Sequence, residues 1–580
     1  MITDREEPVE LQLQSKRWKL APHASEQELA RFTGLHPLVV QLLHNRHIDG
    51  PDLAADFLAG LVDYDNPYRL RGMTEAVTRL RQALKRGEQI AVYGDFDADG
   101  VTATALLVEV LSALGACVEA YIPDRVDEGY GLNLKALRKL YQRGVRLVVS
   151  VDCGIRSFHE VDQARRGLDL IVTDHHAPAP DRPLPPALAI INPKQPGCPY
   201  PHKDLSGAGL AFKLAQGLLR AEQRRVDPPE LAEEALLDLV ALGTVADLVP
   251  LLGENRSLVR RGLERLNEAA RPGVEALMAE AGLRRGDVDA TAIGFRLGPR
   301  LNAAGRIDTA MKAYHLLTSR DPLETRDLAQ KLGALNRARQ QLTEETVAEA
   351  ERQIQNDDPD ARLYMAASAD FEPGVVGLAA SRLTEAYYRP SVVVELGPEV
   401  SRGSCRSIPE FHITEALDDC QDLLARHGGH AAAAGFTVRT ENLEALRQRL
   451  KAIAAERLDD VELKPTLEID AEIDLASVDW DTRAALRTIE PCGMGNPQPV
   501  LVSRRVEVRS RRPIGREGKH LKLVLGDSRG LAWDAIFFRQ GALSQHVPGQ
   551  VDVAYRLGVN EWNRQKRLQI EVLDLREPSP

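Results

Sequence analysis

The chain has 580 residues, with 74 Lys and Arg against 85 Asp and Glu, which gives a formal net charge of −11. With 43% hydrophobic and 27% charged residues, its composition excludes global disorder, a collagen-like repeat and a uniformly basic nucleic-acid coat. The length allows about three or four domains at roughly 150 residues each, and any nucleic acid must be bound through local patches or metal ions.

Nothing in the sequence indicates a membrane or secreted protein. No window approaches the roughly 18 uncharged apolar residues of a transmembrane helix, and the first residues lack the basic and apolar regions of a signal peptide. The six cysteines include no Cys-x-x-Cys pair and predict free thiols in a reducing cytoplasm, not a zinc ribbon or disulfide framework. They are Cys117, Cys153, Cys198, Cys405, Cys420 and Cys492.

The first two regions differ in their predicted secondary structure. Residues 1–85 predict a helical region, in which Ser25 begins a helix. From residue 86 to residue 322, short apolar runs first alternate with amphipathic, helix-length stretches, and a mainly helical part follows. Buried strands that alternate with helices predict a parallel sheet in an α/β domain. The apolar runs are 90–93, 118–122, 147–151, 170–173 and 188–191.

Three further regions complete the chain. Residues 323–358 form a helix-like run interrupted only by Gly333, and its even charge mix predicts a solvated connector. At 1.5 Å per residue this helix would span roughly 50 Å. Residues 359–460 predict a second α/β unit. Residues 461–580 contain alternating strands separated by turn residues, which favour a small antiparallel β-barrel.

The strongest chemical signal is the loop Gly94–Gly100, which directly follows the first predicted strand. Asp95, Asp97 and Asp99 would repel one another unless cations occupied the site. A surface turn is the plain alternative, since Asp and Gly are common turn residues. The loop also begins like an EF-hand, but Leu106 takes the place of the twelfth-position glutamate and no helix precedes it, which disfavours calcium.

Acids and histidines also follow two other predicted strands. Asp152 comes directly after 147–151, and Asp174, His175 and His176 come directly after 170–173. Ligands of open α/β sheets bind at the carboxyl ends of the strands, and carboxylates with imidazoles suit Mn²⁺ or Mg²⁺. Two such ions about 3.5–4 Å apart are a common arrangement for phosphoester cleavage. The three strand ends therefore predict a site for divalent metal ions.

Two later segments leave alternatives open. Asp247 lies in the almost wholly apolar segment 242–250, where a buried carboxylate needs a partner, so it is either a metal ligand or part of a salt bridge or helix cap. Arg300, Asn302 and Arg306 cluster among glycine and alanine. This set suits phosphate oxygens and equally suits structural ion pairs.

The second α/β unit and the predicted barrel carry weaker signals for nucleic acid. Gly-rich loops that contain Ser404, Arg406 and His430 would let backbone N–H groups approach an anion. In the barrel, residues 504–522 hold eight Lys and Arg against two Glu, and aromatic residues follow, a combination typical of single-strand binding. The aromatic residues are Trp533, Phe537, Phe538, Tyr555 and Trp562, several of which must belong to the core.

Taken in chain order, these motifs resemble the RecJ family of bacterial single-strand-specific 5′→3′ exonucleases, within the DHH phosphoesterase superfamily. The resemblance covers nearly the whole chain. One departure is Cys405, where the family pattern predicts glycine, although the adjacent Ser404, Arg406 and Ser407 remain. The matching segments are Gly94–Gly100, Pro123–Arg125, Gly129–Leu132, Val151–Ile155, Thr173–His176, Ala241–Leu251, Gly298–Arg306, Gly374–Gly377 with Ser381 and Arg382, and Gly428–Gly435.

The resemblance implies an α/β fold and a domain assignment. It implies a DHH-type parallel-sheet catalytic domain with a helical extension at 86–322, joined by a long linker helix at 323–358 to a DHHA1-type substrate-binding domain at 359–460. It also implies a C-terminal OB-fold β-barrel that binds nucleic acid at 461–580. Residues 1–85 would form an N-terminal helical region.

The resemblance further implies roles for individual residues. Two divalent cations, Mn²⁺ or Mg²⁺, would be held by Asp95, Asp97, Asp99, Asp152, His175 and Asp247, with Asp152 as the bridging ligand. The catalytic residues would be Asp152, His175 and His176, of which His176 lies beside the scissile phosphate. Substrate phosphates, including the 5′ end, would be bound by Arg125, Ser404, Arg406 and His430. The strand near the site would be steadied by Arg300, Asn302 and Arg306.

The implied function is a metal-dependent exodeoxyribonuclease that releases 5′-mononucleotides from single-stranded DNA in recombinational and mismatch repair. A single-strand-binding protein and a RecQ-type helicase would be its partners. We expect a monomeric cytoplasmic enzyme, associated with the nucleoid during repair. One alternative is a DHH-family phosphodiesterase for oligonucleotides or cyclic dinucleotides, which would have little use for the barrel. The other is an inactive Cdc45-like scaffold, which would lack metal ligands, whereas every expected ligand is present.

Overall fold

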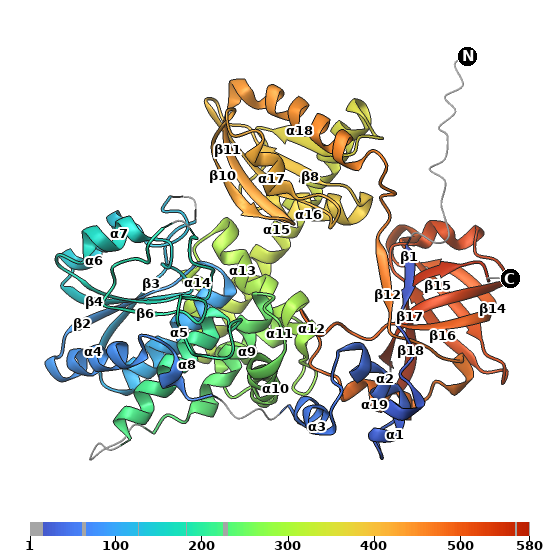
Figure 1. Cartoon of the computed structure of the whole chain (residues 1–580), viewed down its shortest axis with the longest axis horizontal. Coiled ribbons are helices and arrows are strands. Elements are labelled where there is room, and N and C mark those ends of the chain that lie inside the picture. Colours follow the sequence, from blue (N-terminus) through green and yellow to red (C-terminus); the bar gives the residue numbers. More distant parts are fainter. Residues whose placement is uncertain are drawn as a thin grey trace. The chain divides into compact units, whose positions relative to one another are not determined.

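The computed structural model (Figure 1) describes residues 16–60, 65–125, 127–180, 182–223, 230–562 and 565–578. The chain folds into two compact units. The larger contains Gly60–Val461 with Gly493–Gly495, and the smaller contains Met1–Ala59, Glu462–Cys492 and Asn496–Pro580. Within the described ranges, every helix is too short or too polar to cross a bilayer.

The larger unit begins with a five-stranded parallel sheet of order β3-β2-β4-β5-β6. This confirms the predicted parallel sheet. Its strands are β2 (Gln89–Tyr93), β3 (Cys117–Tyr121), β4 (Val145–Val151), β5 (Asp169–Thr173) and β6 (Ala189–Ile191).

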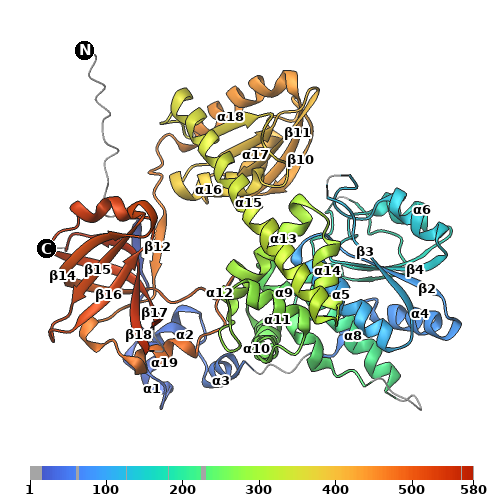
Figure 2. The ribbon, with the colours of Figure 1, turned by 180° about the vertical axis from the view of Figure 1, so that it is seen from behind.

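Helices cover both faces of this sheet (Figures 1 and 2). Val148 of β4 belongs to the core under α6 and α7, whereas its neighbour Val149 belongs to the core under α4, α5 and α8. Successive strand residues point to opposite faces, so a strand buried on both sides needs an unbroken apolar run. The helices are α4 (Met73–Arg86), α5 (Ala98–Ala113), α6 (Leu134–Gln142), α7 (Phe158–Ala164) and α8 (Gly207–Glu222).

A helical extension follows the sheet, as predicted. Lys213 of α8 and Glu254 of α10 form an ion pair with Nζ 2.8 Å from Oε1, and both side chains are fully buried. This pair fixes the extension to the sheet domain. The extension comprises α9 (Leu237–Ala246), α10 (Gly253–Glu268), α11 (Pro272–Glu280), α12 (Ala290–Ala292), the π-helical turn η3 (Ile293–Leu297), α13 (Gly298–Ile307) and α14 (Met311–Thr318).

The long helix α15 (Pro322–Asp357) is continuous over 36 residues. It begins where the Asp321 side chain accepts a hydrogen bond from Leu323 N at 2.9 Å, an N-cap that satisfies one of the free N–H groups of the first turn. The expectation of a solvated connector is wrong for one face, because Ala329, Leu332 and Asn336 are buried there. This face packs against α11, α13 and α14.

A second sheet, of order β10-β11-β9-β8-β7, completes the larger unit. Only β7 and β8 pair in parallel, and the other neighbours are antiparallel. Its elements are β7 (Tyr364–Ser368), α16 (Val376–Tyr387), β8 (Ser391–Glu395), β9 (Val400–Arg406), α17 (Ile413–Asp418), β10 (Leu424–His430), β11 (Ala433–Arg439) and α18 (Leu443–Leu458).

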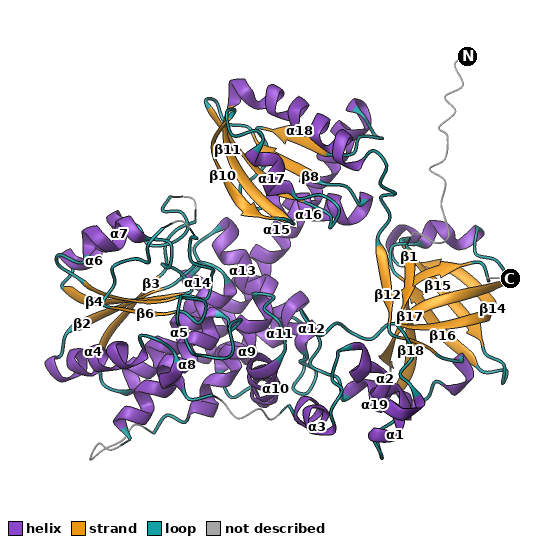
Figure 3. Cartoon of the chain, in the orientation of Figure 1, coloured by secondary structure: helices purple, strands orange, loops and turns teal. Residues whose placement is uncertain are grey.

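The smaller unit contains the predicted barrel, whose strands Figure 3 shows in orange. The strand order is β14-β15-β16-β18-β17, closed by a β14–β17 pairing. The prediction of an antiparallel barrel is wrong at two places, because β16 and β18 pair in parallel and so do β13 and β14. The strands are β13 (Ala471–Glu472), β14 (Leu501–Ile514), β15 (His520–Gly526), β16 (Ala532–Phe537), β17 (Gln550–Trp562) and β18 (Gln565–Arg576).

The described N-terminal residues join this barrel unit. β1 (Arg17–Leu20) pairs in parallel with β12 (Thr466–Ile469), and α2 (Pro37–Asn45) packs against α19 (Trp480–Arg487). Residues 1–85, predicted as a helical region, therefore also contain a strand. The remaining helices of this part are α1 (Glu26–Arg31) and α3 (Pro51–Ala59). Helices α2 and α3 of this region contribute to the barrel core, whereas α4 packs on the parallel sheet.

Candidate metal centre

The candidate centre lies at the carboxyl ends of β2, β4 and β5. The structure brings all six predicted metal ligands together there, in sets whose ligand atoms lie within 4.8 Å of one another. One set is Asp95, Asp97 and Asp152; another is Asp99, His175 and Asp247; a third is Asp152, His175 and His176.

Two helix N-termini hold the aspartate loop in place. Asp97 is the N-cap of α5, and its Oδ1 accepts hydrogen bonds from Asp99 N and Gly100 N at 3.0 Å. The Asp99 carboxylate accepts from Gly207 N at 2.6 Å and Ala208 N at 2.8 Å, at the start of α8. Free N–H groups and the helix dipole both favour negative charge at such positions. The two carboxylates are thus fixed before any cation binds.

Asp152 has a left-handed backbone, with φ of 62°, directly after β4. Such a conformation costs on the order of 1–3 kcal/mol in a residue other than glycine, and Asp is among the residues that tolerate it. The side chain is buried, with 1% of the residue exposed. The strain is therefore maintained by the surrounding structure at a residue that points into the centre.

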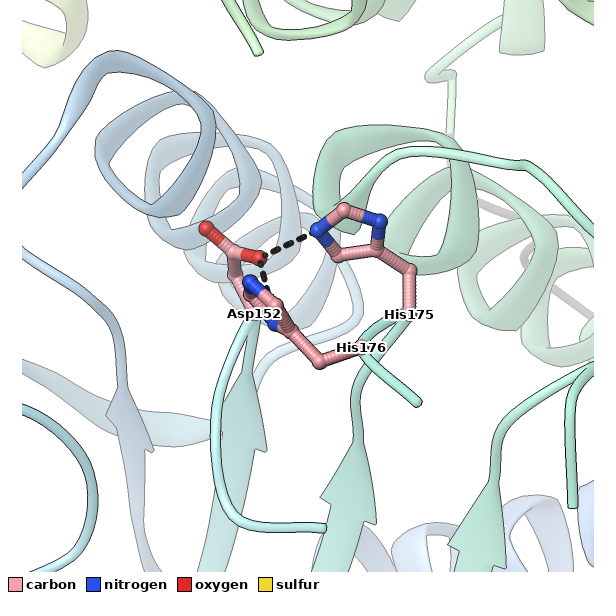
Figure 4. Close-up of side chains that lie close together, drawn as sticks. All are labelled: Asp152, His175 and His176. Carbon is pink, nitrogen blue, oxygen red and sulfur yellow. Dashed lines mark ion pairs between the residues drawn. The ribbon is translucent and has the colours of Figure 1, made fainter. Parts of the chain in front are cut away.

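His175 lies between two carboxylates. Its Nε2 is 3.2 Å from Asp152 Oδ1 and 3.3 Å from Asp247 Oδ2. Figure 4 shows the ring of His175 facing the Asp152 carboxylate. Among the described residues, neither ring nitrogen of His175 has a hydrogen-bond partner, nor have Asp95 Oδ1 and Asp152 Oδ1. Buried oxygen and imidazole donors left without hydrogen bonds fit divalent cations such as Mn²⁺ or Mg²⁺.

The electrostatics of the centre point the same way. Burial, with the repulsion of neighbouring carboxylates, raises the pKa of Asp95 to about 8, of Asp99 to about 7 and of Asp247 to about 9. The pKa of Asp152 is raised for the same reasons. Burial lowers the pKa of His175 to about 3, so its imidazole is neutral, the form that binds a metal. Bound cations would remove the repulsion among the carboxylates.

Asp174, which is not among the predicted site residues, contacts the ring of His176. His176 Nδ1 lies 2.9 Å from Asp174 Oδ1, and the hydroxyl of Tyr130 lies 3.2 Å from the same nitrogen. Burial lowers the pKa of His176, but the Asp174 carboxylate, together with Asp97 and Asp95, outweighs this effect and the net shift is upward. Asp174 is thus a positioning residue. Its place in the same motif as the two histidines was the available signal.

Asn302 of α13 contacts the aspartate loop, and Arg306 of the same helix is close enough for Asp97 to act on its pKa. Asn302 Oδ1 accepts a hydrogen bond from Ala98 N at 2.7 Å, so this carboxamide positions the loop that carries the carboxylates. Arg306 Nη1 donates to Gly374 O at 3.3 Å, a contact from the first α/β domain to the second.

Arg125 lies over the ring of Phe96, with Cζ 4.9 Å from its centroid. Asp95 and Asp97 act on the pKa of Arg125, which burial lowers.

Arg300 is a predicted substrate residue whose interactions within the described residues do not involve the candidate metal ligands. Its Nη1 donates to Arg296 O at 2.7 Å. The charges that act on its pKa, which burial lowers, are Glu280, Arg296 and Arg337. None of these belongs to the metal centre.

Ser404, Arg406 and His430 gather on the second sheet. Arg406 Nη1 donates to Ser404 Oγ at 3.2 Å. Ala433 pairs with Arg406 on one side and with His430 on the other, which places both on the same face of the sheet. Cys405 between them is buried, and burial raises the pKa of its thiol to about 12. The departure from the family pattern is therefore an inert core residue.

Part of the basic barrel segment is neutralised internally. Arg504 pairs with Glu472 at 3.0 Å and with Asp552 at 2.9 Å, and Lys522 pairs with Asp534 at 2.8 Å. Of the aromatic residues, Trp533, Phe537 and Tyr555 are buried in the core, whereas Phe538 is 52% exposed. The side chain of Trp562 lies outside the described residues. Phe538 is the one of these aromatics that the described surface presents to a ligand.

Three family models match the chain. They are the DHH family, N-terminal domain at residues 89–244, the DHHA1 domain at 361–456 and the RecJ OB domain at 469–574. Among curated proteins, the single-stranded-DNA-specific exonuclease RecJ of Bacillus subtilis is 39% identical over 96% of this chain and 70% of its own length. RecJ of Escherichia coli is 35% identical over 92% of this chain and 95% of its own length.

Solved structures agree. This chain matches the crystal structure of RecJ from Thermus thermophilus in complex with Mn²⁺ with a TM-score of 0.82 and 31% identity. The match covers 97% of this chain and 80% of the other chain. The complex of the same protein with Mg²⁺ gives a TM-score of 0.77 and 30% identity, over 97% of this chain and 79% of that protein.

Proposed function

Because this chain belongs to the RecJ family, we propose that it is a single-stranded-DNA-specific exonuclease that works 5′→3′ and releases 5′-mononucleotides. The observation that carries the proposal is the buried set of carboxylates and imidazoles at three strand ends. Within the described residues, Asp95 Oδ1, Asp152 Oδ1 and both ring nitrogens of His175 lack hydrogen-bond partners there. Its cofactors are divalent cations, Mn²⁺ or Mg²⁺.

The ligand sets suggest how two cations would be held. Asp95, Asp97 and Asp152 would hold one, and Asp99, His175 and Asp247 the other. Asp152, whose Oδ1 lies 3.2 Å from His175 Nε2, would be the bridging ligand. When bound, the cations would lower the pKa of an attacking water and neutralise charge that develops on the phosphate.

The chain's own residues would orient the reaction. With Nδ1 of His176 held by Asp174, its Nε2 is left to exchange a proton with the phosphate or the leaving oxygen. Asn302 keeps the aspartate loop fixed through Ala98 N. Arg125 and Arg306 would bind phosphate oxygens beside the metals, and Ser404, Arg406 and His430 would bind the 5′ end. Arg300 would contact the strand farther from the metals.

The barrel favours a polynucleotide over a small substrate. An enzyme for cyclic dinucleotides or short oligonucleotides has little use for a module that matches the RecJ OB domain. We also propose recombinational and mismatch repair as its context, and a single-strand-binding protein and a RecQ-type helicase as its partners. We further propose that the enzyme is monomeric and cytoplasmic and that it associates with the nucleoid during repair.

A labelled-strand assay tests the function. With Mn²⁺, single-stranded DNA labelled at its 5′ end should release labelled mononucleotide first. Duplex DNA, RNA and a cyclic dinucleotide, run in parallel, should react far more slowly. A ladder of long labelled fragments would instead indicate an endonuclease or a 3′ exonuclease and would overturn the proposal.

A further inference from the structure

The linker helix α15 carries an arginine that no motif singled out. Arg339 is half-buried, and its Nε is buried without a hydrogen-bond partner in the described part of the chain. Burial lowers the pKa of Arg339, and the charge that adds to this effect is another arginine, Arg382 of α16. A guanidinium in such a place normally has a carboxylate beside it, because burying an unpaired charge is costly.

Arg339 belongs to an arginine cluster, defined here as Arg125, Arg306, Arg339 and Arg406. Burial, together with the positive charges of Arg125, Arg339 and Arg406, lowers the pKa of Arg306 to about 10. The four residues come from the loop after β3, from α13, from α15 and from β9. Elements far apart in the sequence thus bring three positive charges close enough to Arg306 to act on its pKa.

Packing explains how these elements meet. Helix α15 packs against α13 and then against α16. Arg306 Nη1 touches Gly374 O, and Gly377 of the same segment lies against Ser404 and Arg406, since a Cβ there would be 3.0 Å from Ser404 Oγ and 3.3 Å from Arg406 Nη2. Arg339 therefore belongs to the region where the linker helix passes from the metal-binding domain to the domain of Arg406.

Two aspartates partly offset the positive charge of the arginine cluster. Asp97 raises the pKa of Arg306, and Asp95 and Asp97 raise that of Arg125. Both are candidate metal ligands, so bound cations would cancel most of this compensation. The cluster would then need an external anion, and planar guanidinium groups suit phosphate oxygens in particular.

We propose that Arg339 binds a backbone phosphate of the DNA strand, next to the phosphates bound by Arg306 and Arg406. The linker helix is then part of the substrate-binding surface as well as the connection between the two α/β domains. This inference rests on the proposed function, because it requires a polynucleotide with several phosphates.

The test compares Arg339→Gln with Arg352→Gln, a matched control on the same helix. Arg352 is 73% exposed and pairs with Glu349, so its loss should leave binding unchanged. Affinity for a fluorescein-labelled single-stranded oligonucleotide is measured by anisotropy in EDTA over a range of salt concentrations, and Mn²⁺-dependent turnover is measured separately. Arg339→Gln should weaken binding about tenfold and reduce the slope of log K against log salt by about 0.7.

The outcomes separate the two proposals. If the parent protein degrades single-stranded DNA but Arg339→Gln keeps both its affinity and its salt slope, the role of Arg339 is wrong and the function stands. A weaker affinity with an unchanged salt slope would indicate a structural role and would also overturn the inference. If the parent protein binds the oligonucleotide but does not degrade it, the proposed function fails, while the salt slope still decides whether Arg339 contacts phosphate.

Discussion

Gly207 has no room for a side chain because the side chain of Asp152 lies within 3 Å of where its Cβ would be. An added Cβ would be 2.6 Å from Asp152 Cβ and 2.9 Å from Asp152 Oδ1. The same glycine donates its N–H to Asp99. The first residue of α8 thus positions two candidate metal ligands, one through a hydrogen bond and one through the space that it leaves free.

Gly207→Ala should lower Mn²⁺ affinity and nuclease activity about 10- to 100-fold, the usual effect of disturbing residues behind the ligands. Isothermal titration with Mn²⁺ and initial rates on single-stranded DNA measure the effect. Gly209→Ala is the control, because a Cβ there would come no closer than 3.4 Å, to Ser206 Oγ. Equal losses in both variants would show that the effect belongs to the helix and not to Asp152.

Asp152→Asn should reduce Mn²⁺-dependent activity to below about one-thousandth of that of the parent protein while leaving the fold intact. The candidate metal ligands act as one unit, so removing one of them should abolish most of the activity that the whole set provides. Asparagine is preferred to alanine because it tolerates the positive φ of this position. Circular dichroism checks the fold. Asp162→Asn, which removes a partly exposed partner of Arg165, should keep full activity. Retained turnover in Asp152→Asn would remove this residue from the metal centre.

The metal-free protein should lose stability as the pH rises from about 5 to 9. The carboxyls of Asp95, Asp99 and Asp247 have pKa values raised to about 8, 7 and 9, so the folded state binds more protons than the unfolded state in this range. Their contribution is present at low pH and is lost as the pH passes through the folded-state pKa values. Thermal unfolding in EDTA at several pH values measures this.

Saturating Mn²⁺ should reverse the trend, because cation binding requires the ionised ligands and releases their protons. At 100 times its dissociation constant it should add about 2.7 kcal/mol to the free energy of unfolding. Asp247→Asn should flatten the pH dependence of the metal-free protein. A metal-free Tm that rises steadily over this pH range would contradict the repulsion argued for the centre.

Lys213→Met should destabilise the larger unit by about 3–5 kcal/mol, because Glu254 would be left as a buried charge without its partner. Tyr200 donates a hydrogen bond to the same carboxylate at 2.5 Å and cannot neutralise it. Urea unfolding measures the change. Lys331→Met is the control, since the Lys331–Asp327 pair is more than half exposed and should contribute less than about 1 kcal/mol.

A fragment of residues 60–461 should cleave short oligonucleotides but bind long single strands much more weakly than the whole chain. The fragment must begin at residue 60, because β1 and α2 belong to the barrel unit and would lose their partners. Filter binding with oligonucleotides of increasing length measures the difference. Equal affinity of the fragment and the whole chain for a long strand would remove the barrel from substrate binding.

The metal centre could be predicted in good part because its signal is local. Asp95, Asp152 and His175 each follow a buried apolar run, and parallel strands bring their carboxyl ends to one edge of a sheet. The role of Asn302 could not be predicted. Its carboxamide bonds Ala98 N, which lies 204 positions away in the sequence, and an Asn among small residues is equally suited to a phosphate.

The sequence by itself determined the parallel sheet, the long helix, the barrel strands and the candidate ligands at three strand ends, because periodicity and strand-end chemistry act over a few residues. Only the tertiary structure decided that β1 pairs with β12, that the charges acting on Arg300 lie outside the candidate metal centre and that Arg125, Arg339 and Arg406 act on Arg306. These relationships depend on contacts between distant segments. Since an arginine on a helix has the same local pattern whether it faces water, a carboxylate or another arginine, only packing distinguishes the three cases.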